Sequence, residues 1–599
     1  MSSDTYEFSK SLHEQSLDHE TPYSKKQWNY INDTNGGNYT VGGATLVQFD
    51  GSSIFNSNHF IPPSDMYTAV PIVRVAAFST AGSGTAIAPT AVSITAGSEW
   101  ITSLKAGHWN LLHALEVQND GRTVIQQTPN INYYNNFTML SNLSESDLIS
   151  YGQSIGIGRL DNERSIKFSG TASTSCIGGN GVKNNNIFAN VDTTGVIGTS
   201  VVGMQPLNGT FGTQMLNDGL YTRSVPSASS VVFAASAAGA SNVYGTTGTL
   251  SLMSQTNMNA EFKSNFQISN NYMVWYDTAI IRLKDAHDWF AKMPLVQNLN
   301  LQMRMYLNTG VVGMTYKTGS AGPMYMHGTN NTFSSTCPLI VNNLAASAPA
   351  TTAQLVAGLF IAKSVTTSML GMNLNVSAAA HPMNSCRLYF SMVQIKPTLL
   401  PRYIESNRAK RVLYKTALYQ NLANISAGAT YSALIQSGVT RISGVLLIPW
   451  VSAATHGLIT AVDGTAVTVG FSEPNSPFDT APVTSCLSLT QLNVAIGGVN
   501  ELMNFASYGY ENFLQQVALY DKINASDLGL SCGLINQSRW ELAYRYYWID
   551  CSRYADSIAD VPRNVTVTFQ NNTLQAIDVA AFVESINSLT VDVVTGRLS

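Results

Sequence analysis

The hydrophobic pattern of residues 276–307 predicts a strand, a short helix and a second strand. Residues 279–283 are mostly apolar and favour a strand, whereas apolar residues recur at helical spacing over 285–293. Pro294 cannot continue a helix, and every second residue from 299 to 305 is apolar, as in a half-buried strand. We therefore expect one helix over 285–293, held between two strands.

The same plan recurs near the C-terminus. A strand-like run ends at Ile549, a helical stretch covers residues 552–559, Pro562 follows, and apolar residues alternate over 565–569. An internal repeat of this kind would determine the whole fold, so the rest of the chain has to be compared with it first.

Two predicted hairpins extend the repeat. An Asn-Asp-Gly turn at 119–121 and a Gly-Gly turn at 497–498 each lie between runs of alternating apolar residues, and such turns are a strong short-range hairpin signal. A helical patch follows each hairpin, at 144–151 in the first half and at 514–520 in the second. The features therefore recur in the same order in both halves.

The spacings of the two halves also agree. Trp28 and Phe137 are 109 residues apart, and Tyr403 and Phe513 are 110 residues apart. The stretch from Phe137 to Pro294, however, spans 157 residues, against 49 for the matching part of the second half. We interpret the chain as two copies of one β-rich unit, with large insertions in the first copy only.

This organisation predicts an all-β fold. Two tandem units of about eight strands each, with short helices and with large loops on the first unit, describe a double jelly roll. We place an N-terminal arm at residues 1–24, the first jelly roll at 25–397 and the second at 398–599. The insertions of the first roll fall at about 160–265 and 309–372.

Composition adds a prediction about assembly. The chain has 599 residues, of which 45% are hydrophobic and only 11% are charged, about half the usual charged share. Such a chain can bury a large core but has little charge to keep a large surface soluble, which favours an obligate oligomer. The net charge of −4 argues against a protein that coats nucleic acid.

Cysteine usage and the N-terminus indicate the compartment. The six cysteines stand singly, and none has the spacing of a zinc site, so we expect reduced, buried thiols. The N-terminus lacks the apolar core of a signal peptide, and the apolar runs are too short to span a bilayer. We expect a product made inside the host cell and not secreted by a signal peptide.

No convincing catalytic site emerges from the titratable residues. His108 and His113 lie with Glu116 near a predicted strand, where alternation would put the two histidines on opposite faces. His287 and Asp288 lie on the helix that both halves share, but the second half has no histidine there. We therefore predict no enzyme, no catalytic residues, no cofactor, no metal site and no small-molecule substrate.

One basic cluster follows the linker at residues 397–401. Its members are Arg402, Arg408, Lys410, Arg411 and Lys415. Such a cluster is either a solvated helix face or a basic patch on an inner surface that meets an acidic polymer or a lipid surface. The sequence leaves both interpretations open.

Several segments resemble double-jelly-roll major capsid proteins, most nearly those of polinton-like viruses and virophages. The resemblance covers nearly the whole chain from Trp28 onward, and its motifs are structural. They lie at residues 28–33 leading to 47–50, 282–290 with 293–296, 336–339, 531–537 and 591–596.

The resemblance implies a viral major capsid protein located in the virion. It implies a homotrimer, with two upright jelly rolls per chain, that forms a pseudo-hexameric capsomer and tiles an icosahedral shell around a DNA genome. It implies contacts with neighbouring capsomers and with minor capsid and penton proteins, and weaker contacts with the genome or an inner membrane. The insertions of the first roll would then form an outer turret.

Two other classes remain on the sequence alone. A carbohydrate-active enzyme on a β-sandwich would need two facing carboxylates, and none recur in a plausible place in the sequence. A trimeric receptor-binding or lectin-like β-protein of a virion surface would also be poor in charge and rich in Asn, Ser and Thr. Such a protein would need no duplicated unit and should carry aromatic clusters in exposed loops.

Overall fold

The fold is seen in a computed structural model. The residues it describes are 22–37, 39, 45–51, 59–79, 100–105, 107–157, 221–223, 266–268, 273–316, 324–329, 339–341, 353–361, 365–369, 372–376, 383, 385–452, 474, 484, 487–502, 507–518, 532–542, 544–552 and 560–598.

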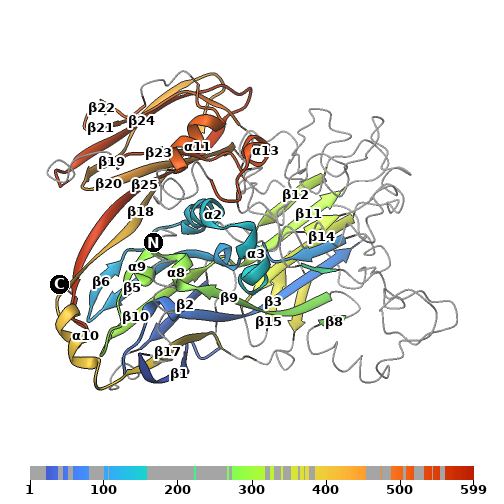
Figure 1. Ribbon diagram of the computed structural model, residues 1–599. Helices are drawn as coiled ribbons and strands as arrows, with labels where there is room; N and C mark the ends of the chain where they lie inside the picture. Colours follow the sequence, from blue (N-terminus) through green and yellow to red (C-terminus); the bar gives the residue numbers. More distant parts are fainter. Residues whose placement is uncertain are drawn as a thin grey trace.

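The first half of the chain forms a sandwich of two antiparallel sheets. One sheet contains the strand order β1-β17-β3-β9, and the other has the order β2-β10-β5-β6. We call this sandwich the first roll (Figure 1). Its strands are β1 (Tyr23–Asn32), β2 (Thr45–Asp50), β3 (Tyr67–Ser79), β5 (Leu112–Asn119), β6 (Arg122–Ile125), β9 (Met273–Arg282), β10 (Leu301–Leu307) and β17 (Arg387–Ile395).

The second half forms another sandwich, which we call the second roll. Its sheets have the orders β18-β25-β20-β23 and β19-β24-β21-β22. The strands are β18 (Lys410–Ile425), β19 (Thr430–Val439), β20 (Ile442–Val451), β21 (Leu489–Ile496), β22 (Val499–Asn500), β23 (Tyr547–Asp550), β24 (Arg563–Asn571) and β25 (Ile577–Val591).

The two rolls have the same topology. When the eight strands of each roll are numbered in chain order, both have one sheet in the order 1-8-3-6 and another in the order 2-7-4-5. All these strand pairs are antiparallel. The predicted fold class, two tandem eight-stranded jelly rolls, is confirmed.

Both predicted hairpins form, and the backbone angles of their turns explain why the turn sequences predicted them. Asp120 and Gly121 connect β5 to β6 with φ values of 49° and 75°, and Gly497 and Gly498 connect β21 to β22 with 59° and 88°. A two-residue turn with two positive φ angles matches the twist of the flanking strands, and it favours glycine and aspartate.

The helices agree with the predictions only in part. The patch at 144–151 is α3 (Glu145–Tyr151), which starts with a capping box between Ser144 and Asp147. The patch at 514–520 belongs to α11 (Tyr510–Ala518), which starts earlier than expected. The longest helix among the described residues, α2 (Ile131–Asn142), was not predicted.

The predicted single helix over 285–293 is wrong. Two short helices take its place, α8 (Leu283–Ala286) and α9 (Asp288–Lys292), because His287 between them is extended, with φ of −158°. Its side chain accepts a hydrogen bond from the Trp289 amide and so starts α9 as an N-cap. Most of the helix expected at 552–559 lies outside the described residues.

The insertions of the first roll contribute further strands. β14 pairs with β3, β11 with β14 and β12 with β11, which extends the first-roll sheet at the right of the view in Figure 1. Most of the insertion at 160–265 and residues 1–21 of the arm predicted at 1–24 lie outside the described residues. The last two residues of that predicted arm, Tyr23 and Ser24, belong to β1 and so to the first roll. The remaining strands are β4 (Trp100–Ser103), β7 (Tyr221–Arg223), β8 (Phe266–Ile268), β11 (Gly310–Tyr316), β12 (Met324–Thr329), β13 (Leu339–Val341), β14 (Ala353–Phe360), β15 (Val365–Met369) and β16 (Met372–Val376).

Candidate assembly surfaces

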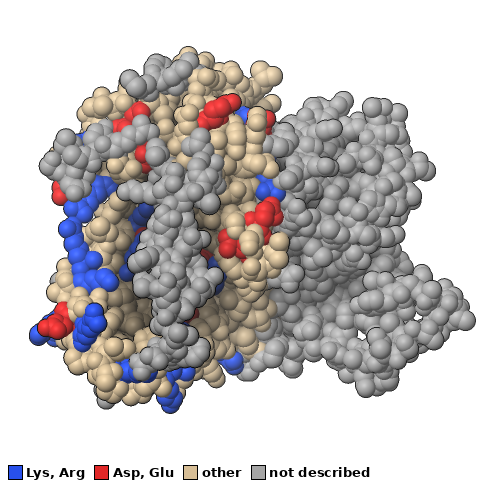
Figure 2. Space-filling model, viewed as in Figure 1, with Lys and Arg blue, Asp and Glu red and all other residues tan. Residues whose placement is uncertain are grey.

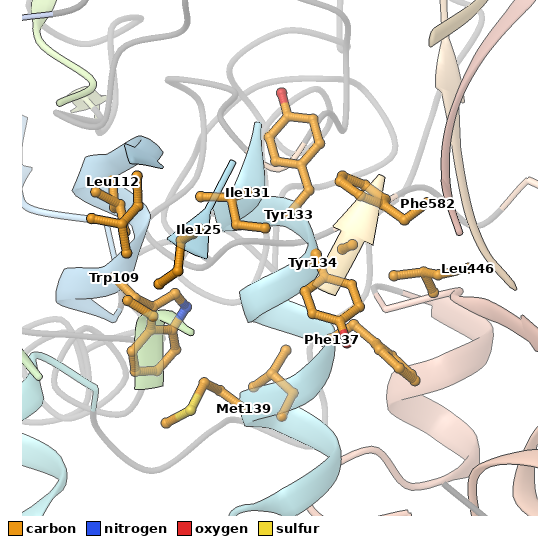
Figure 3. Packing of buried hydrophobic residues seen from close by; sticks show 14 of the residues in the cluster. Trp109, Leu112, Ile125, Ile131, Tyr133, Tyr134, Phe137, Met139, Leu446 and Phe582 are labelled. Carbon is orange, nitrogen blue, oxygen red and sulfur yellow. The ribbon is translucent and has the colours of Figure 1, made fainter. Parts of the chain in front are cut away.

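Helix α2 joins the two rolls. It belongs to the first roll, but its aromatic side chains pack on the sheet β18-β25-β20-β23 of the second (Figure 3). Ring pairs that cross this joint include Tyr133 with Trp450, Tyr134 with Phe582 and Phe137 with Trp548, at centroid distances of 5.9, 5.9 and 5.2 Å. Phe137 also contacts Tyr546 at 5.5 Å.

The opposite side of α2 is bound to the first roll by polar contacts. Asn136 accepts a hydrogen bond from the indole nitrogen of Trp109 at 2.6 Å and donates one to Asn110 at 2.8 Å. All three residues are buried. Buried amides stabilise a core only when they are hydrogen-bonded. Asn136, a residue type that weakens an isolated helix, therefore holds α2 against the first roll through these two bonds.

A buried charge cluster lies beside the aromatic joint. Glu584 of β25 is completely buried, accepts a hydrogen bond from the hydroxyl of Tyr134, and lies 3.3 Å from the ammonium nitrogen of Lys415. The backbone amide of Lys415 donates to the carboxylate of Asp288 at 3.0 Å. Burial raises the pKa of Asp288. Side chains of both rolls thus share one desolvated network.

The predicted basic patch divides into two parts. The ammonium group of Lys415 lies against the buried carboxylate of Glu584, so this residue belongs to the joint between the rolls. The other four residues are exposed, and none has a carboxylate at ion-pair distance among the described residues. We call these four the basic surface; they are Arg402 on α10 (Leu400–Asn407), Arg408 just after α10, and Lys410 and Arg411 at the start of β18.

Figure 2 shows Lys and Arg side chains gathered at the left edge of the molecule, where Figure 1 places α10 and the beginning of β18. Helix α10 itself has no buried residue. This part of the chain therefore offers positive charge on a face that the described residues leave uncovered.

An aromatic surface lies on the outer side of the first roll. Trp28 and Tyr30 on β1 are 55% and 43% exposed. Tyr67 of β3 stacks on Tyr389 of β17 with ring centroids 5.0 Å apart, and these rings contact Trp28 at 5.8 Å and Tyr30 at 5.4 Å, respectively. We call these four residues the aromatic face. Exposed apolar clusters of this kind mark interaction sites.

The aromatic face was missed in the sequence analysis, although a signal was present. Trp28 and Tyr30 are two residues apart, so in a strand they point to the same side. Tyr67 and Tyr389 join them only through the pairing of β1 with β17 and of β17 with β3, which no local pattern reveals.

His108 and His113 contact the backbone or the core of the first roll. His108 lies in a 3-10 helix (His108–Leu111) directly before β5, and its ring nitrogen Nδ1 is 3.0 Å from the amide nitrogen of Ile280. His113 is buried in β5, and Glu116 of the same strand pairs with Arg304 at 3.4 Å. Burial lowers the pKa of His113 and of His287 to about 4.

Three findings concern only the described part of the chain. No group of three or more metal-ligating side chains occurs within it. None of its helices has the length and apolar character needed to cross a bilayer. Its three cysteines, Cys386, Cys532 and Cys551, are free and buried, as expected for them; the other three lie outside the described residues.

Comparison with known proteins finds similar structures. No protein-family model and no curated protein matches the sequence. A chain in the structure of the Sputnik virophage matches with a TM-score of 0.50 and 9% identity, covering 98% of this chain and 91% of that chain. The major capsid proteins of mavirus and Faustovirus match at TM-scores of 0.40, with 8% and 10% identity, covering 98% and 96% of this chain and 92% of each of theirs. The Sputnik match supports the fold as that of a double jelly roll.

Proposed function

We propose that the chain is a viral major capsid protein that forms pseudo-hexameric homotrimers, and that these trimers tile an icosahedral shell around a DNA genome. Two similar rolls per chain support this proposal, because three chains then supply six similar sandwiches around one axis. The likeness to a chain of the Sputnik virophage supports it as well.

The main support for the proposal is that the equivalent sheets of the two rolls differ in burial: the outer face is covered in the second roll and exposed in the first. In the second roll, the outer face of β18, β25, β20 and β23 bears Tyr419, Phe582, Leu446 and Trp548, one row of cross-strand neighbours. All but Tyr419 are fully buried, with α2 of the first roll packed over this face. This aromatic and apolar face of the second roll is thus covered by the first roll of the same chain.

The corresponding strands of the first roll are β1, β17, β3 and β9, and three of them carry the aromatic face. No roll of the same chain covers that face, since Trp28 and Tyr30 remain exposed. In the proposed trimer, the second roll of a neighbouring copy packs against the aromatic face. This contact between copies resembles the contact within one chain, where the first roll packs against the sheet β18-β25-β20-β23. The repeated contact closes the ring after three copies.

The other parts of the chain take roles that follow from this arrangement. The insertions of the first roll form the outer turret, and the partners are neighbouring capsomers together with minor capsid and penton proteins. The protein is structural, without catalysis, and is located in the virion. The unit is duplicated, which favours the shell over a receptor-binding or lectin-like protein, because that class would need no such repeat.

Negative-stain imaging of the purified full-length chain tests the proposal. We expect particles with a pseudo-hexagonal outline and three-fold symmetry, and at high concentration sheets or shells of such particles. A population of monomers with a single cleft would contradict the proposal.

A further inference from the structure

The aromatic face belongs to a row of residues that has an equivalent in the second roll. In the first roll, the direct cross-strand partners on β1, β17, β3 and β9 are Tyr30, Tyr389, Tyr67 and Arg282. In the second roll, the direct partners on β18, β25, β20 and β23 are Tyr419, Phe582, Leu446 and Trp548. Each row crosses strands 1, 8, 3 and 6 of its roll, so the two rows are equivalent.

The second-roll row shows what kind of element docks on such a row. Helix α2, the first helix after the hairpin β5-β6, covers it, with Tyr134 at 5.9 Å from Phe582. The matching helix of the second roll is α11, the first described helix after the hairpin β21-β22. Both helices contain the sequence Tyr-x-Asn-Phe, at 134–137 and at 510–513. Helix α11 is therefore the element expected to dock on the first-roll row.

Helix α11 cannot reach the aromatic face of its own chain. In Figure 1, α11 lies in the upper part of the view and β1 and β17 lie at the bottom. Helix α2 and the sheet β2-β10-β5-β6 lie between them. Only a second copy of the chain can therefore bring α11 onto the aromatic face.

The first-roll row carries a cation that lacks an anionic partner. The guanidinium of Arg387 lies 4.7 Å from the ring centre of Tyr30, and it donates to the hydroxyl of Tyr389 at 3.3 Å. Its Nε has no hydrogen-bond partner. Among the described residues, no carboxylate lies at ion-pair distance from Arg387. This row is therefore suited to a partner that brings a carboxylate.

Helix α11 carries such a carboxylate on its free side. Glu511 and Gln515 are exposed, and residues four apart lie on the same side of a helix. Phe513 is completely buried and packs on Trp540 of its own roll at 5.7 Å. No basic group of the described residues lies at ion-pair distance from Glu511. The free side of α11 is thus polar and acidic.

The equivalence of the rolls also sets the position of this carboxylate. Tyr134 contacts Phe582, and their equivalents are Tyr510 in α11 and Tyr389 in the first-roll row. Glu511 directly follows Tyr510, and Arg387 lies two residues before Tyr389 on β17, on the same side of the strand. A helix that docks as α2 does would therefore bring Glu511 beside Arg387.

We propose that α11 of one copy docks on the aromatic face of the next copy and that Glu511 pairs with Arg387 there. This inference rests on the proposed function, and it names the part of the second roll that makes the contact between copies. Within one chain, the helix supplies the rings; between copies, the sheet supplies them and the helix supplies polar groups. Because the two surfaces differ, the contact is head-to-tail, as a closed ring of three copies requires.

Charge reversal tests the pairing in the full-length chain. The variants Glu511→Lys and Arg387→Glu place like charges together across the interface, which is costly. Each should raise the concentration at which half of the trimer has dissociated by about tenfold or more, measured by mass photometry on dilution. The double variant Glu511→Lys/Arg387→Glu restores the pair with opposite sense and should return this concentration close to the parent value. The control Glu405→Lys, at an exposed position of α10, should leave it unchanged.

The outcomes separate this inference from the proposed function. A parent that is monomeric at every concentration would overturn both. Parent trimers that Glu511→Lys weakens no more than Glu405→Lys does would overturn only the docking of α11. A double variant no more stable than the single variants would overturn the pairing of Glu511 with Arg387.

Crosslinking tests the position of α11 without relying on charge. A photoreactive residue in place of Gln515, in trimers assembled from light and heavy isotope-labelled chains, should react with residues 26–32 or 387–391. We expect peptides that join a light chain to a heavy chain. Crosslinks found only within single chains, or only to other parts of the neighbouring copy, would overturn the proposal.

Discussion

Phe137 of the first roll stacks on Trp548 of the second, with ring centroids 5.2 Å apart and ring planes inclined by 27°. These residues are 411 positions apart in the chain and both are completely buried. The two rolls therefore share one hydrophobic core through α2, and the face that each presents to other molecules has a fixed orientation relative to the other roll.

Phe137→Ala should destabilise the protein. The change removes a buried ring between the rolls and leaves a cavity, which typically costs about 3–5 kcal/mol. Thermal unfolding should show a clearly lower melting temperature, whereas Leu574→Ala, at a position that is 94% exposed, should leave it within about 1 °C because surface substitutions rarely matter. Equal melting temperatures for both variants would contradict the role given to α2.

The pair Lys415 and Glu584 should show strong coupling. Lys415→Met removes the cation 3.3 Å from a completely buried carboxylate, and an uncompensated buried charge costs about 3–5 kcal/mol. The double variant Lys415→Met/Glu584→Gln removes the charge as well and should recover most of the loss. A double-mutant cycle on the free energy of unfolding measures this, and additive effects would show that the pair does not interact.

His287 should make stability depend on pH. Burial lowers its pKa from the usual 6.5 to about 4, so between these values the unfolded chain binds a proton that the folded chain does not. Stability then falls as the pH falls from about 6.5 to 4. Protonation also removes the lone pair that accepts the Trp289 amide.

The variant His287→Asn isolates this effect, because asparagine caps a helix without titrating. Melting temperatures of both proteins, measured from pH 7.5 to 4, should diverge below about pH 6.5, with the parent losing more. All other titrating groups contribute equally to the two curves. Parallel curves would show that His287 does not carry the dependence.

Gly444→Ala should weaken the second roll. A methyl group at this position of β20 would overlap the six-membered ring of Trp548, so the indole would have to leave its place beneath Phe137. Overpacking of this kind costs about 1–3 kcal/mol. Near-ultraviolet circular dichroism, which reports the packing of tryptophans, should change together with the melting temperature, and an unchanged spectrum would contradict the close packing at Gly444.

The fold could be predicted from the sequence because its signals are local and occur twice. The Asp120-Gly121 turn and the alternation along β10 and β24 depend only on neighbours in the chain. α2 escaped prediction because its asparagines are poor helix formers, and the buried contacts of one of them, Asn136, with Trp109 and Asn110 are visible only in the fold. The aromatic face and the inward turn of Lys415 arise from strand pairing across hundreds of residues, which no local pattern contains.

The native mass of the full-length chain tests the central claim most directly. The parent should have three times the mass of the 64.5 kDa chain, because the aromatic face of each copy is covered by the second roll of the next. The variant Trp28→Glu/Tyr30→Glu places two charges on that face, and native mass spectrometry should find it as a monomer with the melting behaviour of an intact fold. A monomeric parent, or a variant that still forms trimers, would contradict the account.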